Sequence, residues 1–126
     1  MTEVLDPATL ERLRTLARVS NNPVLLSHLI ELFLEDTARR MAGLRQAVAQ
    51  QNPQALRVLA HSIRGGAAIV GASEIVSKCN ELEELQSAWT ARIPAVVDEL
   101  ARAIEHAQIA LMEFLADVEP TKSSTS

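Results

Sequence analysis

The sequence is poor in cysteine, aromatic residues and glycine, and each shortage excludes a class of structure. Cys79 is the single cysteine among 126 residues, so no internal disulfide can form and a CxxC metal or redox site is excluded. Aromatic residues make up 2% of the chain, and glycine occurs four times. Alanine (19) and leucine (17) dominate instead. Because strands favour β-branched and aromatic residues, this composition predicts helices and excludes an all-β domain.

Excess basic charge and long apolar runs are also missing. The formal net charge is −4, from 16 acidic and 12 basic side chains. This balance argues against nucleic acid as the main partner, because phosphate binding needs a basic surface. No apolar run approaches the roughly 20 residues that span a bilayer, and the start of the chain shows no signal peptide. We therefore expect no membrane contact, a cytoplasmic location and, from the native-looking start, a stand-alone protein.

Prolines mark where several helices are expected to begin. Asp6, Asn22 and Asn52 each stand directly before a proline, which places a good N-cap residue ahead of a proline at the first helical position. Pro94 is expected in the first turn of the last helix, where its missing N–H costs nothing. Apolar residues at three- and four-residue steps then predict five helices, at about residues 7–19, 23–50, 53–70, 73–89 and 93–117.

The lengths and short connections of these helices predict an all-α fold. The last four are expected to form an antiparallel four-helix bundle, with the short N-terminal helix packed across one end. Gly71 is expected to end the third helix and Ser73 to cap the fourth. Residues 1–118 are expected to form one domain, and residues 119–126, which follow the last periodic segment, to form a disordered tail.

The helix predicted at 53–70 has one face that a plain bundle does not explain. At about 100° per residue, His61 lies opposite an apolar stripe that is expected to face the core. The members of this stripe are Leu56, Leu59, Ile63, Ala67 and Val70. His61 is therefore expected on the exposed face. Alone it would be an ordinary surface histidine, but its neighbours favour a functional role.

Those neighbours are Gly65, Ala68 and Arg64. A glycine inside a helix costs about 1 kcal/mol relative to alanine, so Gly65 suggests clearance for a closely approaching partner. Ala68, one turn further on, is small and leaves this part of the surface free of a bulky side chain. Arg64 places a permanent cation near the imidazole, suited to holding an anion. An exposed imidazole nitrogen, a cation and a clearing together predict phosphoryl transfer to and from His61.

A resemblance to a known family lies in residues 60–72, A-H-S-I-R-G-G-A-A-I-V-G-A. This stretch resembles the signature of histidine-containing phosphotransfer (HPt) domains: histidine, any residue, an aliphatic residue, Lys or Arg, Gly, and a second Gly six residues further on. The segment H-S-I-R-G-G at 61–66 is especially similar to the phosphotransfer domain of chemotaxis kinases, and the segment K-C-N-E-L-E at 78–83 resembles the HPt family's following helix. Gly66 and Ile69 depart from the small or polar residues common in many members.

The resemblance implies a role for each matching residue. His61 would be the phosphoacceptor, through Nε2, and Arg64 would steady the phosphoryl oxygens. Gly65 would let the partner's active site close over the imidazole. Glu83 matches a glutamate of chemotaxis-type domains, which accepts a hydrogen bond from Nδ1–H and makes Nε2 more nucleophilic. An ordinary surface position among neighbouring glutamates remains the alternative for Glu83.

The partners also follow from the resemblance. A receiver-domain phospho-aspartate or a sensor histidine kinase, including a hybrid kinase, would give its phosphoryl group to His61, and a response-regulator aspartate would take it. The chain has no ATP-binding motif, so we expect a phosphocarrier without kinase activity. Mg²⁺ would come from the receiver. Docking is expected on exposed residues of the helix at 23–50 and on Arg57, Val58, Ala68 and Ile69, with partial burial as the alternative for Ile69.

Three other interpretations remain open. A non-catalytic bundle that binds another helix or dimerises would explain the periodicity but not Gly65 beside His61. The phosphoacceptor helix of a sensor kinase would need an acidic residue after the histidine and a proline at +5, where Ser62 and Gly66 stand. A metal site is not expected, because the histidines and Cys79 have no ligand spacing. We expect a monomer with its histidine face free, although the outer face of the last helix and Trp89 offer a possible contact.

Overall fold

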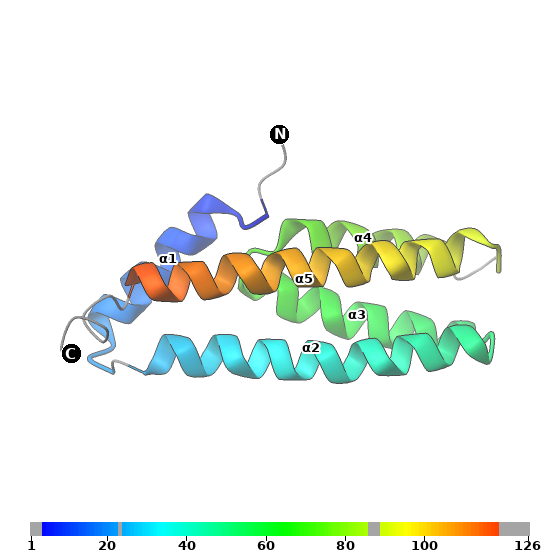
Figure 1. The fold of residues 1–126 in the computed structure, drawn as a ribbon, viewed down its shortest axis with the longest axis horizontal. Helices are drawn as coiled ribbons and strands as arrows, with labels where there is room; N and C mark the ends of the chain where they lie inside the picture. Colours follow the sequence, from blue (N-terminus) through cyan, green and yellow to red (C-terminus); the bar gives the residue numbers. More distant parts are fainter. Residues whose placement is uncertain (1–3, 23, 86–88, 119–126) are drawn as a thin grey trace.

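A computed structural model describes residues 4–22, 24–85 and 89–118, and these residues form five helices joined by short connections (Figure 1). No strand occurs in these three ranges, so the predicted all-α class is confirmed. The helices are α1 (Pro7–Val19), α2 (Leu25–Ala49), α3 (Pro53–Ile69), α4 (Ser73–Leu85) and α5 (Arg92–Val118). The predicted tail at 119–126 lies outside the described residues, and the proposed domain boundaries stay a prediction.

Helices α2 to α5 form the predicted bundle. In Figure 1 successive helices run in opposite directions, α2 and α5 lie along the same side, and α3 and α4 lie behind them. Helix α3 packs against α2 and α4, and α5 packs against α4 and α2, so the four helices close around one core. The larger side chains that are fully buried there come from α2 to α5: Leu26, Ile30, Leu44, Leu56, Ile63, Ile75, Leu82, Ile93, Val96, Val97, Leu100 and Leu111.

Two of the three predicted proline-linked caps are confirmed. The Asp6 carboxylate accepts a hydrogen bond from the Thr9 N–H, and the Asn52 side chain accepts one from the Ala55 N–H. Because α3 begins at Pro53, directly after the Asn52 cap, His61 falls in the middle of that helix. Pro94 lies in the first turn of α5, as predicted.

Two predicted helix ends and one predicted cap were wrong. Helix α2 begins at Leu25 rather than at residue 23, because the Asn22 side chain accepts from the Val24 N–H two residues on and makes a turn there; Pro23 itself lies outside the described residues. Ser73 is the first residue of α4 rather than its cap. The same helix ends at Leu85; of the predicted extension to 89, residues 86–88 lie outside the described part and Trp89 is not helical.

Helix α1 crosses one end of the bundle, near the start of α2 and the end of α5 (Figure 1). The Asp6 N–H donates to the Gly71 carbonyl at 2.7 Å, which joins the start of α1 to the α3–α4 connection. The Arg14 guanidinium lies 5.2 Å from the centre of the Phe114 ring, a cation–π contact that links α1 to α5. The predicted end-capping helix is therefore confirmed.

Substituting Gly71 with alanine is expected to destabilise the fold. Gly71 has φ +74°, and an added Cβ would lie 2.8 Å from the buried Thr9 Cβ. The left-handed backbone costs about 1–2 kcal/mol for an L-residue, and overpacking costs about 1–3 kcal/mol more. We expect urea denaturation to show a loss of about 2–5 kcal/mol in the free energy of unfolding. Gly66→Ala is the control, because its Cβ would meet Phe33 at an ordinary 3.4 Å; an equal loss in both variants would contradict this account.

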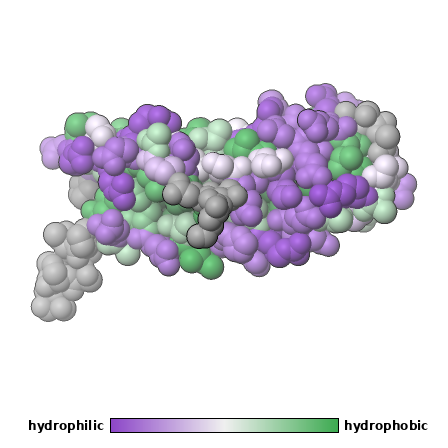
Figure 2. Space-filling view, turned by 90° about the horizontal axis from the view of Figure 1, so that it is seen from above, coloured by the Kyte–Doolittle hydropathy of each residue, from purple (hydrophilic) through white to green (hydrophobic). Residues whose placement is uncertain are grey.

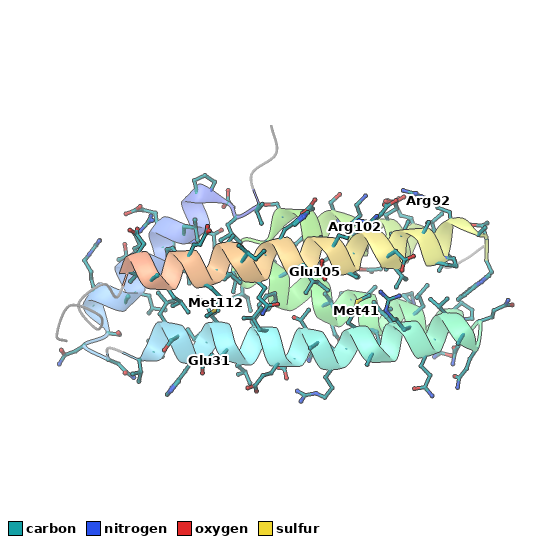
Figure 3. The ribbon with its side chains drawn as sticks, in the orientation of Figure 1. Glu31, Met41, Arg92, Arg102, Glu105 and Met112 are labelled. Atoms are coloured by element: carbon teal, nitrogen blue, oxygen red, sulfur yellow. The ribbon has the colours of Figure 1, made fainter. Side chains whose placement is uncertain are left out.

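An ion-pair network joins α4 to the start of α5, where Arg92 lies (Figure 3). Lys78 Nζ lies 2.9 Å from Glu99 Oε1, and Arg92 Nη1 lies 3.0 Å from Glu99 Oε2. Arg92 also reaches Glu81 at 2.8 Å. The half of the molecule on the right of Figure 2, where α5 begins, is mostly hydrophilic. The network holds the α4–α5 pair in register through opposite charges at the surface.

This network predicts a pH dependence of stability. The hydrogen bond from Lys78, helped by Arg92, holds the pKa of Glu99 below its ordinary value of 4.5. Because this pKa is lower in the folded state, the stabilisation is present above about pH 4.5 and is lost as the pH falls through the folded-state pKa. Glu99→Gln is therefore expected to lower the urea midpoint at pH 7, with the difference from wild type shrinking below pH 4. For Glu105→Gln, an exposed change on the same helix, the difference in urea midpoint from wild type should not depend on pH in this way. A difference for Glu99→Gln that does not change with pH would contradict the prediction.

Candidate functional site

Helix α3 presents His61 on its outer face, as predicted. Of the predicted core stripe, Leu59 is half-buried and the other four members are buried, which turns the opposite side of the helix to the surface. The His61 side chain is 68% exposed. The imidazole is therefore open to a macromolecular partner while its helix is held firmly by the core.

Two predicted site residues surround the inner ring nitrogen of His61. Arg64 Nη2 lies 2.8 Å from His61 Nδ1, and Glu83 Oε1 lies 3.7 Å from the same nitrogen. Glu83 comes from α4, so the packing of α4 on α3 brings it to His61 from twenty-two residues away in the sequence. Nε2 has no hydrogen-bond partner among the described residues. The cluster therefore engages the ring at Nδ1 and not at Nε2.

A fourth residue, Asn80, completes the cluster and is not among the site residues predicted from the sequence. Arg64 Nη1 donates to Asn80 Oδ1 at 3.1 Å, and Arg64 Nε lies 3.1 Å from Glu83 Oε2. Asn80 precedes Glu83 by three residues, so the two share one face of α4. This i, i+3 spacing was the available signal, but it becomes informative only once α4 is known to face Arg64.

Glu83 is partly withdrawn from solvent, with 22% of its side chain exposed. Its buried Oε2 makes no well-aligned hydrogen bond, so the nearby Arg64 cation balances this oxygen by charge alone. Burial, with the Glu83 carboxylate adding to it, raises the pKa of the nearby Cys79 thiol to about 12. Cys79 is therefore a neutral thiol that packs under the cluster and is a poor nucleophile.

The packing around position 65 does not require a glycine. A Cβ added there would meet nothing within 4 Å. Alanine would thus fit inside α3 and would favour the helix by roughly 0.5–1 kcal/mol. The free space lies outside the molecule, next to His61, which is where an approaching partner would need it.

The predicted docking residues all lie on the surface of α3. Arg57, Val58, Ala68 and Ile69 are exposed, and Ile69 is 71% exposed, which excludes the alternative of partial burial against α2. Beside them runs an apolar groove between α2 and α3. Its lining includes the exposed Leu29, Leu32 and Ile69, together with Leu13, Leu26, Ile30, Phe33, Asp36, Arg40, Gly66 and Val70. The sequence predicts that exposed residues of α2 take part in docking but does not say which ones. The sequence signal for these docking residues was the pair Leu29 and Leu32, two apolar residues that lie outside the core stripe of α2.

The other histidines do not join this site. His28 lies on α2, and His106 on α5 lies 3.4 Å from Glu74. Within the described ranges, no three His, Cys, Asp or Glu side chains gather as metal ligands. No helix in the described part of the chain is long and apolar enough to cross a membrane.

Comparisons with known proteins identify the family and the fold. The family model described as "Hpt domain" matches residues 28–117, which include His61, Arg64, Gly65 and Glu83. The structure is similar to the crystal structure of histidine-containing phosphotransfer protein B (HptB) from Pseudomonas aeruginosa PAO1, with a TM-score of 0.81 and 26% sequence identity. The match covers 93% of this chain and 98% of that chain. A search of curated protein sequences found no significant match.

The family match covers most of the chain and contains the whole histidine cluster, so the resemblance first found at residues 60–72 extends to the fold. Proteins of this kind are phosphocarriers rather than kinases, and they work with receiver domains and kinases. The chain belongs to the Hpt domain family, the histidine phosphotransfer modules of two-component signalling.

Proposed function

We propose that His61 accepts a phosphoryl group from the phospho-aspartate of a receiver domain, or from a sensor histidine kinase, and passes it to a response-regulator aspartate. The observation that carries this proposal is the exposed imidazole beside an unfilled clearing at Gly65 and a cation at Arg64. In the transfer, Nε2 attacks phosphorus, the P–N bond forms, and the P–O bond to the aspartate breaks. The aspartate leaves as a carboxylate.

Each residue of the cluster has a separate part in this step. Arg64 is within reach of His61, so its guanidinium can move to the phosphoryl oxygens and neutralise their charge. With Arg64 on the phosphoryl oxygens, Glu83 can accept from Nδ1–H and hold the ring orientation. The partner receiver supplies Mg²⁺, which neutralises the phosphoryl group on its own side of the complex. Catalysis is then mostly alignment and charge neutralisation, shared by both proteins.

The partner is expected to dock over the outer face of α3 and the groove beside it. Val58 and Ile69 are exposed apolar side chains on that face, and Leu29 and Leu32 extend the apolar surface onto α2. An exposed apolar surface next to a polar reactive group is typical of a protein-binding site. Because this face must be free for exchange, we propose that the protein acts as a monomer, in the cytoplasm where response regulators receive phosphoryl groups.

The experiment that tests the proposal is transfer from a phosphorylated receiver domain in the presence of Mg²⁺. We expect label to move onto this chain, to be acid-labile and base-stable as phosphohistidine is, and to map to His61 by mass spectrometry. A small donor, phosphoramidate, tests the same nucleophile without a partner. Failure of both donors to modify His61 would overturn the proposal and leave a non-catalytic interaction module as the better interpretation.

A further inference from the structure

The contact between Arg64 and His61 determines which ring nitrogen carries the proton. A guanidinium group only donates hydrogen bonds, so His61 Nδ1, which lies 2.8 Å from Arg64 Nη2, must be the acceptor. A neutral imidazole has one N–H, and here that N–H is therefore at Nε2. In this tautomer the lone pair of Nε2 belongs to the aromatic ring, so Nε2 cannot attack phosphorus.

Glu83 requires the opposite tautomer. A carboxylate only accepts hydrogen bonds, so Glu83 Oε1 can bind Nδ1 only when Nδ1 carries the proton. Nε2 would then have its lone pair free. Glu83 Oε1 lies 3.7 Å from Nδ1, farther than Arg64 Nη2 and beyond hydrogen-bond length. Arg64 and Glu83 thus compete for one nitrogen, and in this structure Arg64 occupies it.

Helix α4 holds Arg64 in that position. Asn80 Oδ1 accepts from Nη1 at 3.1 Å, and Glu83 Oε2 lies 3.1 Å from Nε. Each of the three guanidinium nitrogens therefore faces a group of α3 or α4: His61, Asn80 or Glu83. The Arg64 side chain is only 34% exposed as a result. A phosphoryl group must draw the guanidinium away from these groups before Arg64 can bind its oxygens.

We propose that Arg64 is a resting-state lock on His61, held by Asn80 as a positioning residue, and that the arriving phosphoryl group opens it. The inference rests on the proposed function and adds a regulatory step to it. Phosphoryl oxygens form short bidentate contacts with a guanidinium and compete well with an amide oxygen. When Arg64 moves to them, Nδ1 takes a proton from water and bonds to Glu83, and Nε2 gives its proton to water. No net proton is gained or lost, and Nε2 becomes nucleophilic only when its substrate is present.

The tautomer of His61 can be measured directly by two-bond ¹H–¹⁵N NMR spectra at a pH where imidazoles are neutral. His28 is an exposed reference in the same spectrum, with no ring hydrogen bond among the described residues. We expect wild-type His61 to carry its proton at Nε2 to a greater extent than His28 does. Arg64→Ala should raise the fraction of His61 that carries its proton at Nδ1 above the fraction found for His28. The double variant Arg64→Ala, Glu83→Gln should return this fraction to the His28 value.

Asn80→Ala tests the lock while leaving Arg64 in place. It should shift the His61 tautomer toward Nδ1–H and raise the initial rate of phosphorylation by phosphoramidate by roughly two- to tenfold, as the loss of one hydrogen bond allows. Ser77→Ala, an exposed change on the same helix, and Arg45→Ala, which removes a cation paired with Asp98, are the matched controls. Neither should alter the tautomer or the rate.

Three results would overturn the lock. These are a wild-type His61 already protonated at Nδ1, an unchanged tautomer in Arg64→Ala, or an unchanged or slower reaction in Asn80→Ala. Each of them leaves the proposed function intact as long as wild-type His61 still accepts a phosphoryl group. Conversely, if His61 is never phosphorylated, the proposed function fails whatever its tautomer. The two failures are therefore distinguishable.

Discussion

Replacing His61 with glutamine is expected to reduce phosphoryl acceptance from a receiver domain to background. Glutamine has similar bulk and hydrogen-bonding capacity, but its amide nitrogen has no lone pair that can attack phosphorus. The position is 68% exposed, so the substitution should leave the fold and the docking surface unchanged. The measurement is radiolabel on this chain after incubation with a phosphorylated receiver and Mg²⁺, with circular dichroism and the urea midpoint as checks of folding.

The two other histidines provide matched controls for this result. His28 and His106 are exposed and lie on α2 and α5, away from the cluster around His61. With phosphoramidate as the donor, which needs no docking surface, His28→Gln and His106→Gln should therefore keep wild-type labelling. Label that persists in His61→Gln and disappears in either control would assign the phosphoacceptor to another residue. The receiver must also still bind His61→Gln, because the lost group is the nucleophile and not the docking surface.

Gly65→Leu is expected to separate chemistry from docking. The added side chain would occupy the open space beside His61, where nothing within 4 Å would restrain it. A displacement of the reacting groups by about 1 Å can cost about 100-fold in rate, so transfer from a receiver should fall by about that factor. Phosphoramidate is small enough to pass, so its reaction with His61 should change little. Both initial rates are measured on the same preparation.

Stability serves as the internal check on Gly65→Leu. Leucine is a better helix former than glycine, so this variant should resist urea at least as well as wild type. Gln108→Leu places the same side chain on the exposed surface of α5 and should transfer normally. A Gly65→Leu protein that reacts with the receiver at the wild-type rate would show that the partner does not need the clearing. Equal losses with both donors would show that leucine disturbs His61 itself.

Local chemistry made much of the fold predictable. The Asp6 and Asn52 caps depend on residues three positions away, and Gly71 depends on its own backbone angle. The apolar stripe of α3 depends only on helical periodicity, so it also placed His61 on the outer face. Asn22 shows the limit of the same reasoning. Its side chain makes a local turn to Val24 instead of capping the helix, and the two outcomes use the same residue types.

The contacts around Nδ1 could not be predicted with the same certainty. Glu81, Glu83 and Glu84 are close together in the sequence, but only the packing of α4 against α3 determines which carboxylate lies near His61. Glu81 instead reaches Arg92. Arg64 was expected to face a phosphoryl group, yet in the free protein it lies against His61, Asn80 and Glu83.

The sequence by itself determined the helices, the exposed histidine and the glycine beside it, because these depend on short-range periodicity and backbone preference. The tertiary structure decided which groups compete for His61 Nδ1, because the relative register of α3 and α4 comes from side chains packing across the core. A shift of one residue in that register would rotate Asn80 and Glu83 by about 100° and remove them from Arg64. The exposed position of the proposed phosphoacceptor thus depends on α3 alone, whereas the contacts at its Nδ1 depend on the packing of α3 against α4.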